Sequence, residues 1–231
     1  SRAMGWRGMP GDAEYRMIAR DIRLARETGA RLHIAHLSTA DGVEMVQKAK
    51  MDGVRITAEV SPHHFTLTDD AVSRYGANAK MNPPLRSEGD RAAVIEGLVD
   101  GTIDAIATDH APHAEYEKQW GLDQAPFGVV GLETALGLTL GLVQQGRLTL
   151  QRAMTCLTSA PAAVLGLPRG TLEPGAAADV TLIDPDAFWT VDPERFRSKS
   201  RNTPFAGRVL KGQVVRTLVA GRTVYQGPDA E

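Results

Sequence analysis

The sequence lacks the features that mark several large classes of protein. Its single cysteine, Cys156, excludes an intrachain disulfide and favours a reducing compartment, so we expect a cytoplasmic protein with this thiol in an apolar helix of the core. A formal net charge of −2 leaves no basic field for nucleic acid. No apolar run approaches the roughly 18 residues that a membrane helix needs. We therefore expect no nucleic-acid or membrane partner.

Aromatic residues are also scarce, at 5%, but the apolar fraction of 42% is enough for a core. Helical periodicity predicts helices over residues 12–28, 40–50, 91–99, 132–144 and 150–165. Short apolar runs predict strands over residues 31–38, 54–60, 79–82 and 103–108. After residue 175 the pattern predicts strands at 178–183 and on both sides of an Ala220–Gly221 turn within 214–225, with an irregular connection over 184–204.

Strands that alternate with helices and end in polar residues are typical of a (β/α)8 barrel, whose functional sites gather at the C-terminal ends of its strands. A complete barrel needs about 250 residues, and only about 165 precede the change of pattern here. We therefore predict an α/β fold. Residues 1–168 would form the C-terminal half of a TIM-type barrel, and residues 169–231 would supply strands of a small β-sandwich domain.

The stretch TDHAPH, residues 108–113, directly follows the last strand of this predicted barrel half. It places Asp109, His110 and His113 within five residues, a set that suits a divalent metal and, through the carboxylate, proton transfer. In the alternative, Asp109 caps a helix and the histidines are exposed. Under the first interpretation, we expect His110 to orient Asp109.

The other histidines are more ambiguous. His36 ends the first predicted strand, where it could bind a metal or a backbone group. His33 lies three residues earlier on that strand, so we expect it on the opposite face, in a packing role. His63 and His64 are adjacent at the end of the second strand, and neighbouring strand residues face opposite ways, so both cannot enter one site.

A long loop over residues 111–128 follows the TDHAPH strand, and loops of this length are commonly lids or binding loops. We expect its 114–126 part to be mobile without substrate. Its charged residues Glu115, Glu117 and Lys118 are expected to be solvated.

Six motifs follow one another in order along nearly the whole chain. They are HLSTADG at 36–42, EVSPHH at 59–64, KMNPPLR at 80–86, TDHAPH at 108–113, APFGVVGLE at 125–133 and GTLEPGAAADVTLID at 170–184. Together they resemble dihydroorotases of the bacterial class I type. The last motif is widespread in the amidohydrolase superfamily, so it indicates only the superfamily, and the first five carry the narrower resemblance.

The resemblance implies a binuclear zinc hydrolase that interconverts dihydroorotate and N-carbamoyl-L-aspartate in pyrimidine synthesis. On this basis His36 would be a metal ligand. Asp109 would bind the second metal and carry the proton from the attacking water to the leaving ring nitrogen. Asn82 and His113 would hold the substrate's polar groups, and the backbone of Phe127–Gly128 would close on the ring.

The resemblance also indicates missing parts. The family's HxH pair, its bridging Asp or carbamylated Lys, a further His and a substrate-binding Arg precede the motifs found here, and the sequence contains no HxH. We therefore expect the C-terminal half of the enzyme, unable alone to hold two metals or turn over substrate. His36 and Asp109 are expected in one cavity, within about 8 Å of each other.

Two alternatives stay open. A hydantoinase or allantoinase would have a similar barrel, but the Asn82 and His113 motifs argue against it. An inactive dihydroorotase-like scaffold of a transcarbamoylase would lose metal ligands while keeping the fold, and the retained His36 and Asp109 argue against that. The expected partners are a small-molecule substrate and either a second copy of the chain or a transcarbamoylase.

Overall fold

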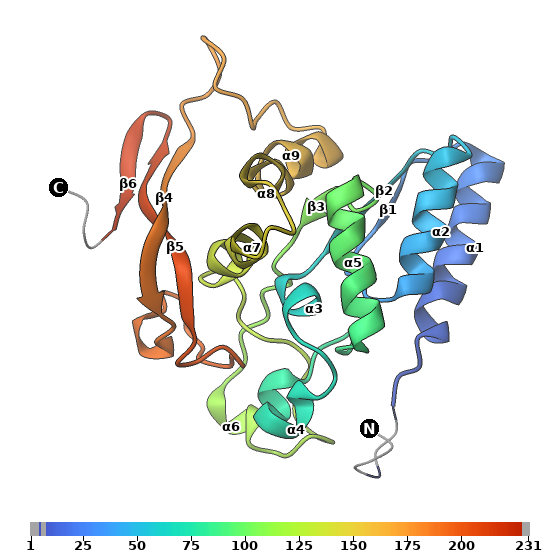
Figure 1. Ribbon diagram of the computed structural model, residues 1–231, viewed down its shortest axis with the longest axis horizontal. Coiled ribbons are helices and arrows are strands. Elements are labelled where there is room, and N and C mark those ends of the chain that lie inside the picture. Colours follow the sequence, from blue (N-terminus) through green and yellow to red (C-terminus); the bar gives the residue numbers. More distant parts are fainter. Residues whose placement is uncertain (1–4, 6–7, 228–231) are drawn as a thin grey trace.

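The computed structural model describes residue 5 and residues 8–227, which form two three-stranded sheets with helices around them. The parallel sheet has the order β1 (Leu32–Ile34), β2 (Ile56–Val60), β3 (Ala105–Ile106). The antiparallel sheet has the order β4 (Val180–Thr190), β5 (Val209–Val219), β6 (Arg222–Gln226). The two sheets lie on opposite sides of α7 (Ala135–Gln144) and α8 (Leu150–Leu157) (Figure 1). The predicted α/β fold is confirmed.

The helices of the parallel half begin and end where their capping residues require. The first, α1, spans Asp12–Thr28 as predicted, and Gly29 after it ends the helix in the left-handed conformation. Thr39 caps α2 (Ala40–Met51) by accepting a hydrogen bond from the Gly42 amide. A capping box between Ser87 and Asp90 starts α5 (Glu88–Asp100). The remaining helices are α3 (Pro62–Thr66), α4 (Ala71–Tyr75), α6 (Glu115–Lys118), α9 (Ser159–Leu165) and the 3₁₀ helices η2 (Gly76–Ala79) and η3 (Pro193–Arg195).

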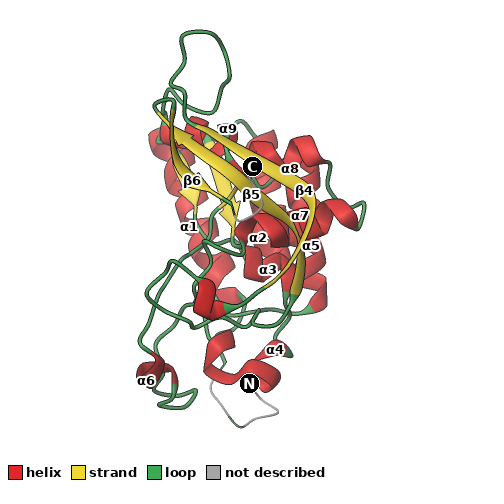
Figure 2. Cartoon of the chain, turned by 90° about the vertical axis from the view of Figure 1, so that its left-hand side faces the viewer, coloured by secondary structure: helices red, strands yellow, loops and turns green. Residues whose placement is uncertain are grey.

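The main core lies between the parallel sheet and its helices. Its fully buried members include Leu37, Val46, Val60, Leu98 and Ile103. Figure 2 shows the antiparallel sheet lying across the helical layer, with α4 and α6 together at one end of the molecule. Among the described residues, no helix combines the length and the apolar character needed to cross a membrane.

The register of the parallel sheet brings the ends of its strands together. Ile34 pairs with Ala58, and Val60 pairs with Ile106. Since parallel strands all point the same way, the residues that follow β1, β2 and β3 emerge at one edge of the sheet. This edge receives the HLST, SPHH and TDHAPH motifs.

Three predictions about elements were wrong. Residues 79–82 are not a strand: Gly76–Ala79 is a 3₁₀ helix, and the alternating burial of Ala79 and Met81 comes from loop packing in a small cluster with Val129. The predicted helix 150–165 breaks at Thr158. Pro161, three residues later, has no backbone N–H to donate, so the helical hydrogen bonds are interrupted at this point. The 184–204 connection is partly regular, because β4 continues through a bulge to Thr190.

Candidate active site

His36 and Asp109 share an uncommon backbone conformation. Both have a positive φ, 55° at His36 and 48° at Asp109, and in the described part of the chain the only other non-glycine residue with positive φ is Ala220, in the β5–β6 turn. This region is unfavourable for residues with a side chain, and strained residues persist where surrounding structure holds them, often at functional sites. The two predicted ligands therefore stand out by their backbone alone.

Glu59 of β2 provides the electrostatic link between these residues. Its Oε1 lies 3.5 Å from His36 Nδ1. Burial raises the pKa of the Asp109 carboxyl, Glu59 raises it further, and His36 opposes both effects. Asp109, His36 and Glu59 are thus close enough for each charge to affect the others, although Glu59 was not among the predicted site residues.

His33 contradicts the expected packing role on the opposite face. Its Nε2 lies 3.2 Å from Glu59 Oε2, the same carboxylate that His36 approaches. The alternation rule fails because β1 ends at Ile34, and the left-handed turn at His36 then redirects the chain. His33, His36 and Asn82 line one cavity of ≈ 300 Å³.

Asp109 is not among the residues that line this cavity. The expectation that His36 and Asp109 lie in one cavity within about 8 Å therefore stays a prediction.

The metal-binding capacity of the described residues is incomplete. The buried His36 Nδ1 has no hydrogen-bond partner, as expected of a nitrogen available to a metal. However, no group of three or more His, Cys, Asp or Glu side chains that could hold a metal occurs in the portion that the structure describes. His36 and Asp109 therefore fit part of a metal site and not a whole one, because catalytic zinc typically takes three protein ligands.

His63 and His64 are not on a strand, so the argument that they face opposite ways was wrong. They occupy the short helix α3, both buried, with ring centroids 4.4 Å apart. Burial lowers the pKa of His63 well below its ordinary value, and His64 and His36 lower it further. Burial likewise lowers the pKa of His64 to about 4. Both rings are consequently neutral near pH 7.

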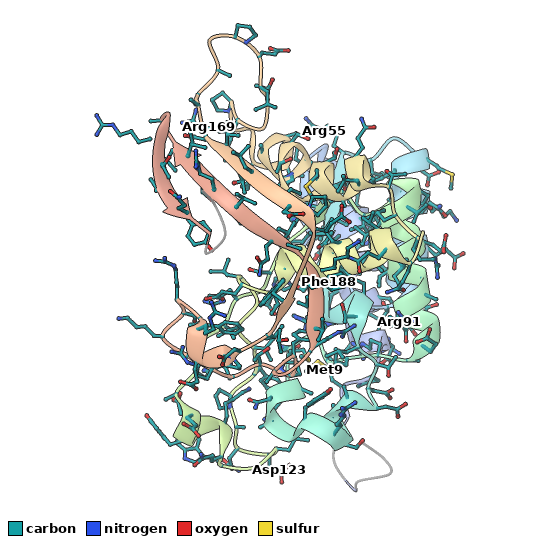
Figure 3. The ribbon with its side chains drawn as sticks, turned by 60° about the vertical axis from the view of Figure 1, so that its left-hand side comes forward. Met9, Arg55, Arg91, Asp123, Arg169 and Phe188 are labelled. Atoms are coloured by element: carbon teal, nitrogen blue, oxygen red, sulfur yellow. The ribbon has the colours of Figure 1, made fainter. Side chains whose placement is uncertain are left out.

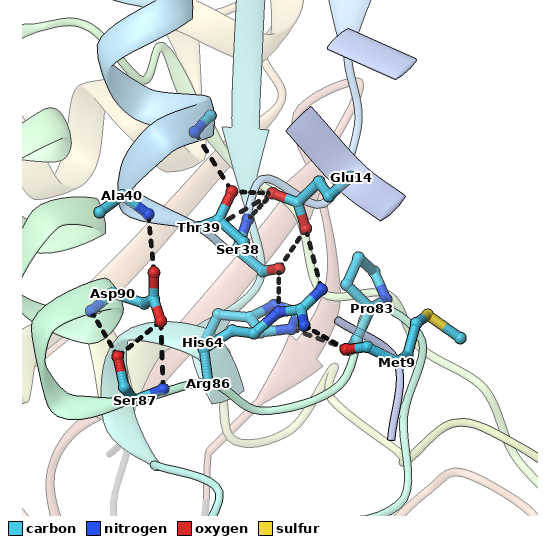
Figure 4. Close-up of polar contacts among 11 residues, drawn as sticks. Met9, Glu14, Ser38, Thr39, Ala40, His64, Pro83, Arg86, Ser87 and Asp90 are labelled. Carbon is cyan, nitrogen blue, oxygen red and sulfur yellow. Dashed lines mark hydrogen bonds and ion pairs between the residues drawn. The ribbon is translucent and has the colours of Figure 1, made fainter. Parts of the chain in front are cut away.

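A buried ion pair between Glu14 and Arg86 connects the segment after His36 to the segment after Asn82 (Figure 4). Glu14 of α1 accepts hydrogen bonds from the backbone amides of Ser38 (2.9 Å) and Thr39 (3.0 Å). Arg86 donates from Nε to Ser38 Oγ at 3.2 Å, and its Nη2 lies 3.6 Å from Glu14 Oε2. Because both charged side chains are largely buried, this network fixes one wall of the cavity.

The structure brings His113, Phe127 and Gly128 together, while their contacts with a substrate stay a prediction. His113 Nε2 lies 2.8 Å from the Phe127 carbonyl oxygen. Asn202 links the same elements: its Oδ1 accepts from the His113 amide, and its Nδ2 donates to the Ala111 and Gly128 carbonyls at 3.0 and 3.1 Å. Asn202 was missed because the 184–204 segment was expected to be only a connection.

His110 does not orient Asp109 with its side chain. Its Nδ1 accepts a hydrogen bond from the Gly131 amide at 3.1 Å, and its Nε2 lies 3.5 Å from Ser198 Oγ. At Gly131 a Cβ would lie only 2.6 Å from the Thr108 carbonyl oxygen. His110 therefore holds the 129–132 backbone against the end of β3.

The 111–128 loop forms more internal contacts than its charged composition predicted. It contains the helix α6, and Lys118 is 8% exposed instead of solvated. Glu117 Oε2 accepts a hydrogen bond from the Ala114 amide at the start of this helix. Mobility of residues 114–126 without substrate stays a prediction, and these contacts show which parts of the loop are restrained.

Comparison with known proteins gives relatives of two kinds. The chain is 61% identical over 227 residues to a dihydroorotase from Pelotomaculum thermopropionicum and 55% identical over 226 residues to one from Syntrophotalea carbinolica. Each alignment covers 98% of this chain and 53% of the relative. The chain therefore spans about half the length of these curated relatives.

Solved structures with the same fold include hydantoinases. An L-hydantoinase (dihydropyrimidinase) from Arthrobacter aurescens superposes with a TM-score of 0.92 at 32% identity, over all of this chain and 54% of that one. A dihydropyrimidinase from Brevibacillus agri has a TM-score of 0.89 at 25% identity, over 94% and 49% of the two chains. The sequence profile of the Amidohydrolase family matches residues 6–224, almost the full length. This chain belongs to the amidohydrolase family.

Proposed function

We propose that this chain is the C-terminal half of a zinc-dependent dihydroorotase, which interconverts dihydroorotate and N-carbamoyl-L-aspartate. The observation that carries the proposal is the pair of left-handed residues, His36 and Asp109, that follow strands on either side of Glu59. The 61% identity to a named dihydroorotase supports the substrate. Residues 1–168 would contribute to the barrel, and residues 169–231 to the β-sandwich.

His36 and Asp109 would each donate one ligand to a zinc pair, and residues outside this sequence would complete the set. When bound, such a pair supplies a water of lowered pKa and a Lewis acid for the amide carbonyl. The buried His36 Nδ1, which forms no hydrogen bond and lies 3.5 Å from Glu59 Oε1, supports this assignment.

The residues of this chain would transfer the proton and bind the substrate. Asp109, whose pKa is raised by burial, would accept the proton of the attacking water and return it to the leaving ring nitrogen. Asn82 is exposed on the cavity wall, where its amide can bind a substrate carboxylate. His113 and the backbone of Phe127–Gly128 would bind the polar edge of the ring.

A hydantoinase is the second candidate, because hydantoinase structures share the fold at TM-scores up to 0.92. An inactive scaffold of a transcarbamoylase is the third, because the described residues hold no complete metal group. Whether the chain belongs to an active dihydroorotase or to an inactive scaffold, we propose a cytoplasmic protein that pairs with a second copy or with a transcarbamoylase.

The test combines this chain with the N-terminal part of the Pelotomaculum dihydroorotase that it does not cover. We expect the chain alone to bind fewer than two zinc ions and to show no turnover. The reconstituted complex should bind zinc and hydrolyse dihydroorotate in preference to hydantoin. Zinc is measured by elemental analysis, and turnover by the absorbance of the substrate.

Asp109→Asn in the complex should lower kcat by at least about a hundredfold, the usual contribution of a positioned acid or base. Asp70→Asn removes the same charge from an exposed position and should leave turnover unchanged. Turnover of hydantoin alone would support the second candidate, and a folded complex without turnover would support the scaffold. Two zinc ions and full turnover in the chain alone would contradict the half-enzyme proposal.

A further inference from the structure

We propose that Lys80 and Lys118 are positioning residues that jointly hold the Phe127–Gly128 backbone in place beside His113. We call these two lysines the clamp. Their contacts with the backbone are independent of the function proposed above, and only the expected effect on turnover rests on that function. Neither lysine belongs to the predicted ligands or substrate contacts. Their side chains arrive from different elements, Lys118 from α6 and Lys80 from the loop after η2.

Lys118 is buried in a way that its local sequence does not predict. It ends a four-residue helix in a charged loop, where a lysine would ordinarily extend into water. Instead its Nζ donates hydrogen bonds of 2.9 Å to each of the Pro126 and Gly128 carbonyl oxygens. Hydrogen bonds of this kind offset the cost of removing a charge from solvent.

Lys80 contacts the same segment through three interactions of its side chain and one of its backbone. Its Nζ donates to the Ala125 carbonyl at 2.6 Å and to the Asp123 carbonyl at 3.2 Å. It also lies 4.5 Å from the centroid of the Phe127 ring, a cation–π distance. Its backbone carbonyl accepts the Gly128 amide at 2.9 Å, so both its main chain and its side chain fix this segment.

The two ammonium groups have carbonyl oxygens where counter-ions would be expected. Burial and the charge of Lys80 lower the pKa of Lys118 to about 8, so placing these cations together is unfavourable. Within the described chain, neither lysine forms a salt bridge with a carboxylate. Four backbone carbonyls of residues 123–128 take that place, which ties the path of the segment to the two side chains. Figure 3 shows Asp123 at the end of the molecule where α4 and α6 lie.

The clamped segment is in direct contact with the TDHAPH loop. Gly128 has a φ of 119°, and a Cβ built there would lie 2.4 Å from Ala111 Cβ and 3.4 Å from His113 Nε2. His113 Nε2 also contacts the Phe127 carbonyl oxygen. A shift of the segment would therefore move the His113 ring with it, and both are proposed to face the substrate.

The test uses Lys118→Met and Lys80→Met in this chain. Each variant removes a charge and its donors but keeps most of the apolar stem. Lys48→Met is the matched control, because Lys48 is an exposed lysine on α2 with the same charge. Hydrogen exchange of the amides in residues 123–128 and the NMR shifts of the His113 ring are measured, and circular dichroism checks that each variant is folded.

We expect both clamp variants to speed exchange in residues 123–128 by at least about tenfold and to move the His113 ring signals. Amides of α1 and α2 should exchange as before, and Lys48→Met should change neither signal. Unchanged exchange and unchanged His113 shifts in a folded Lys80→Met would overturn the proposal, whether or not Lys118→Met folds.

Kinetics of the reconstituted complex provide a second readout. A displaced binding backbone should raise KM for dihydroorotate by about fivefold or more in the clamp variants and change kcat less. If no complex turns over any substrate, the proposed function fails while the exchange data still decide on the clamp. If turnover occurs and the clamp variants have an unchanged KM, the positioning role is contradicted.

Discussion

The parallel and the antiparallel sheets differ in how much of their surface is buried in the core. The sheet with the longer strands is the more exposed one. The parallel strands have three, five and two residues, yet Ile56, Ala58 and Val60 of β2 are almost fully buried among helices. The antiparallel strands β4 and β5 have eleven residues each, but Phe188 is 73% exposed. In the neighbouring strand β6, Val224 is 62% exposed. The short sheet therefore carries both the core and the candidate chemistry.

One face of the long sheet does pack, and the contact is local. Leu210 of β5 is buried against α7, where Gly137 leaves room for it: a Cβ on this glycine would lie 3.0 Å from Leu210. The rest of the sheet contributes less to the core. The comparison can be tested by making equivalent changes in the two regions.

The largest expected difference is between Leu98→Ala in α5 and Leu182→Ala in β4. Leu98 is 0% exposed, so its truncation leaves a cavity and should cost about 2–5 kcal/mol of unfolding free energy. Leu182 is 47% exposed, and its truncation should cost less than about 1 kcal/mol. Chemical denaturation measures both. Equal losses would mean that the two sheets stabilise the fold to a similar degree.

The sequence predicted helices more accurately than strands, for identifiable reasons. Gly29 and Thr39 are local signals that end α1 and start α2, so these boundaries were predicted correctly. Residues 79–82 alternate like a strand, but their pairing depends on distant partners. Here Met81 is buried by Leu85 and Val129 in a loop, a tertiary contact that no local pattern encodes.

The same distinction holds in the candidate site. His36 and Asp109 were predicted from their motifs, and their left-handed backbone sets them apart. That His33 and His36 approach the same carboxylate was not predictable, because His36 lies beyond the end of β1, in a left-handed turn that breaks the alternation of the strand. Lys118 resembled any loop lysine, since its acceptors are backbone carbonyls, which have no sequence signature.

The second prediction concerns the pH dependence of stability. All six histidines precede residue 114 and none lies in the antiparallel sheet, so histidine titration should affect the parallel half. His64 has a pKa of about 4 when folded and an ordinary value of 6.5. Between these values the unfolded chain binds a proton that the folded chain does not. The unfolding free energy should therefore fall as pH drops from 6.5 to 4, by about 3 kcal/mol for this ring.

His64→Gln keeps a donor for the Pro83 carbonyl, which His64 Nε2 contacts at 3.0 Å, but it cannot titrate. Denaturation of the two proteins at several pH values isolates the contribution of His64. The variant should lose less stability than the wild type below pH 6.5 and match its pH dependence above that value. Parallel curves over the whole range would exclude His64 as a source of acid sensitivity.

The smallest expected effects come from one ion pair in each region. Lys50 Nζ lies 2.8 Å from Asp104 Oδ2 and also donates to the Gly101 carbonyl, while Asp104 accepts the Ala58 amide of β2. Both side chains are about a quarter exposed, at 25% and 24%. Lys50→Met leaves the carboxylate of Asp104 partly buried without its cation, so it should cost about 1–3 kcal/mol.

In the antiparallel sheet Lys211 Nζ lies 2.6 Å from Asp186 Oδ1, a shorter distance, but the aspartate is 80% exposed. Water and salt screen this pair, so Lys211→Met should cost less than about 1 kcal/mol, and adding salt should narrow the loss further. Denaturation midpoints at low and high ionic strength measure both variants. A larger loss for Lys211→Met would show that contact distance outweighs burial, and it would reverse the order of importance assigned here to the two sheets.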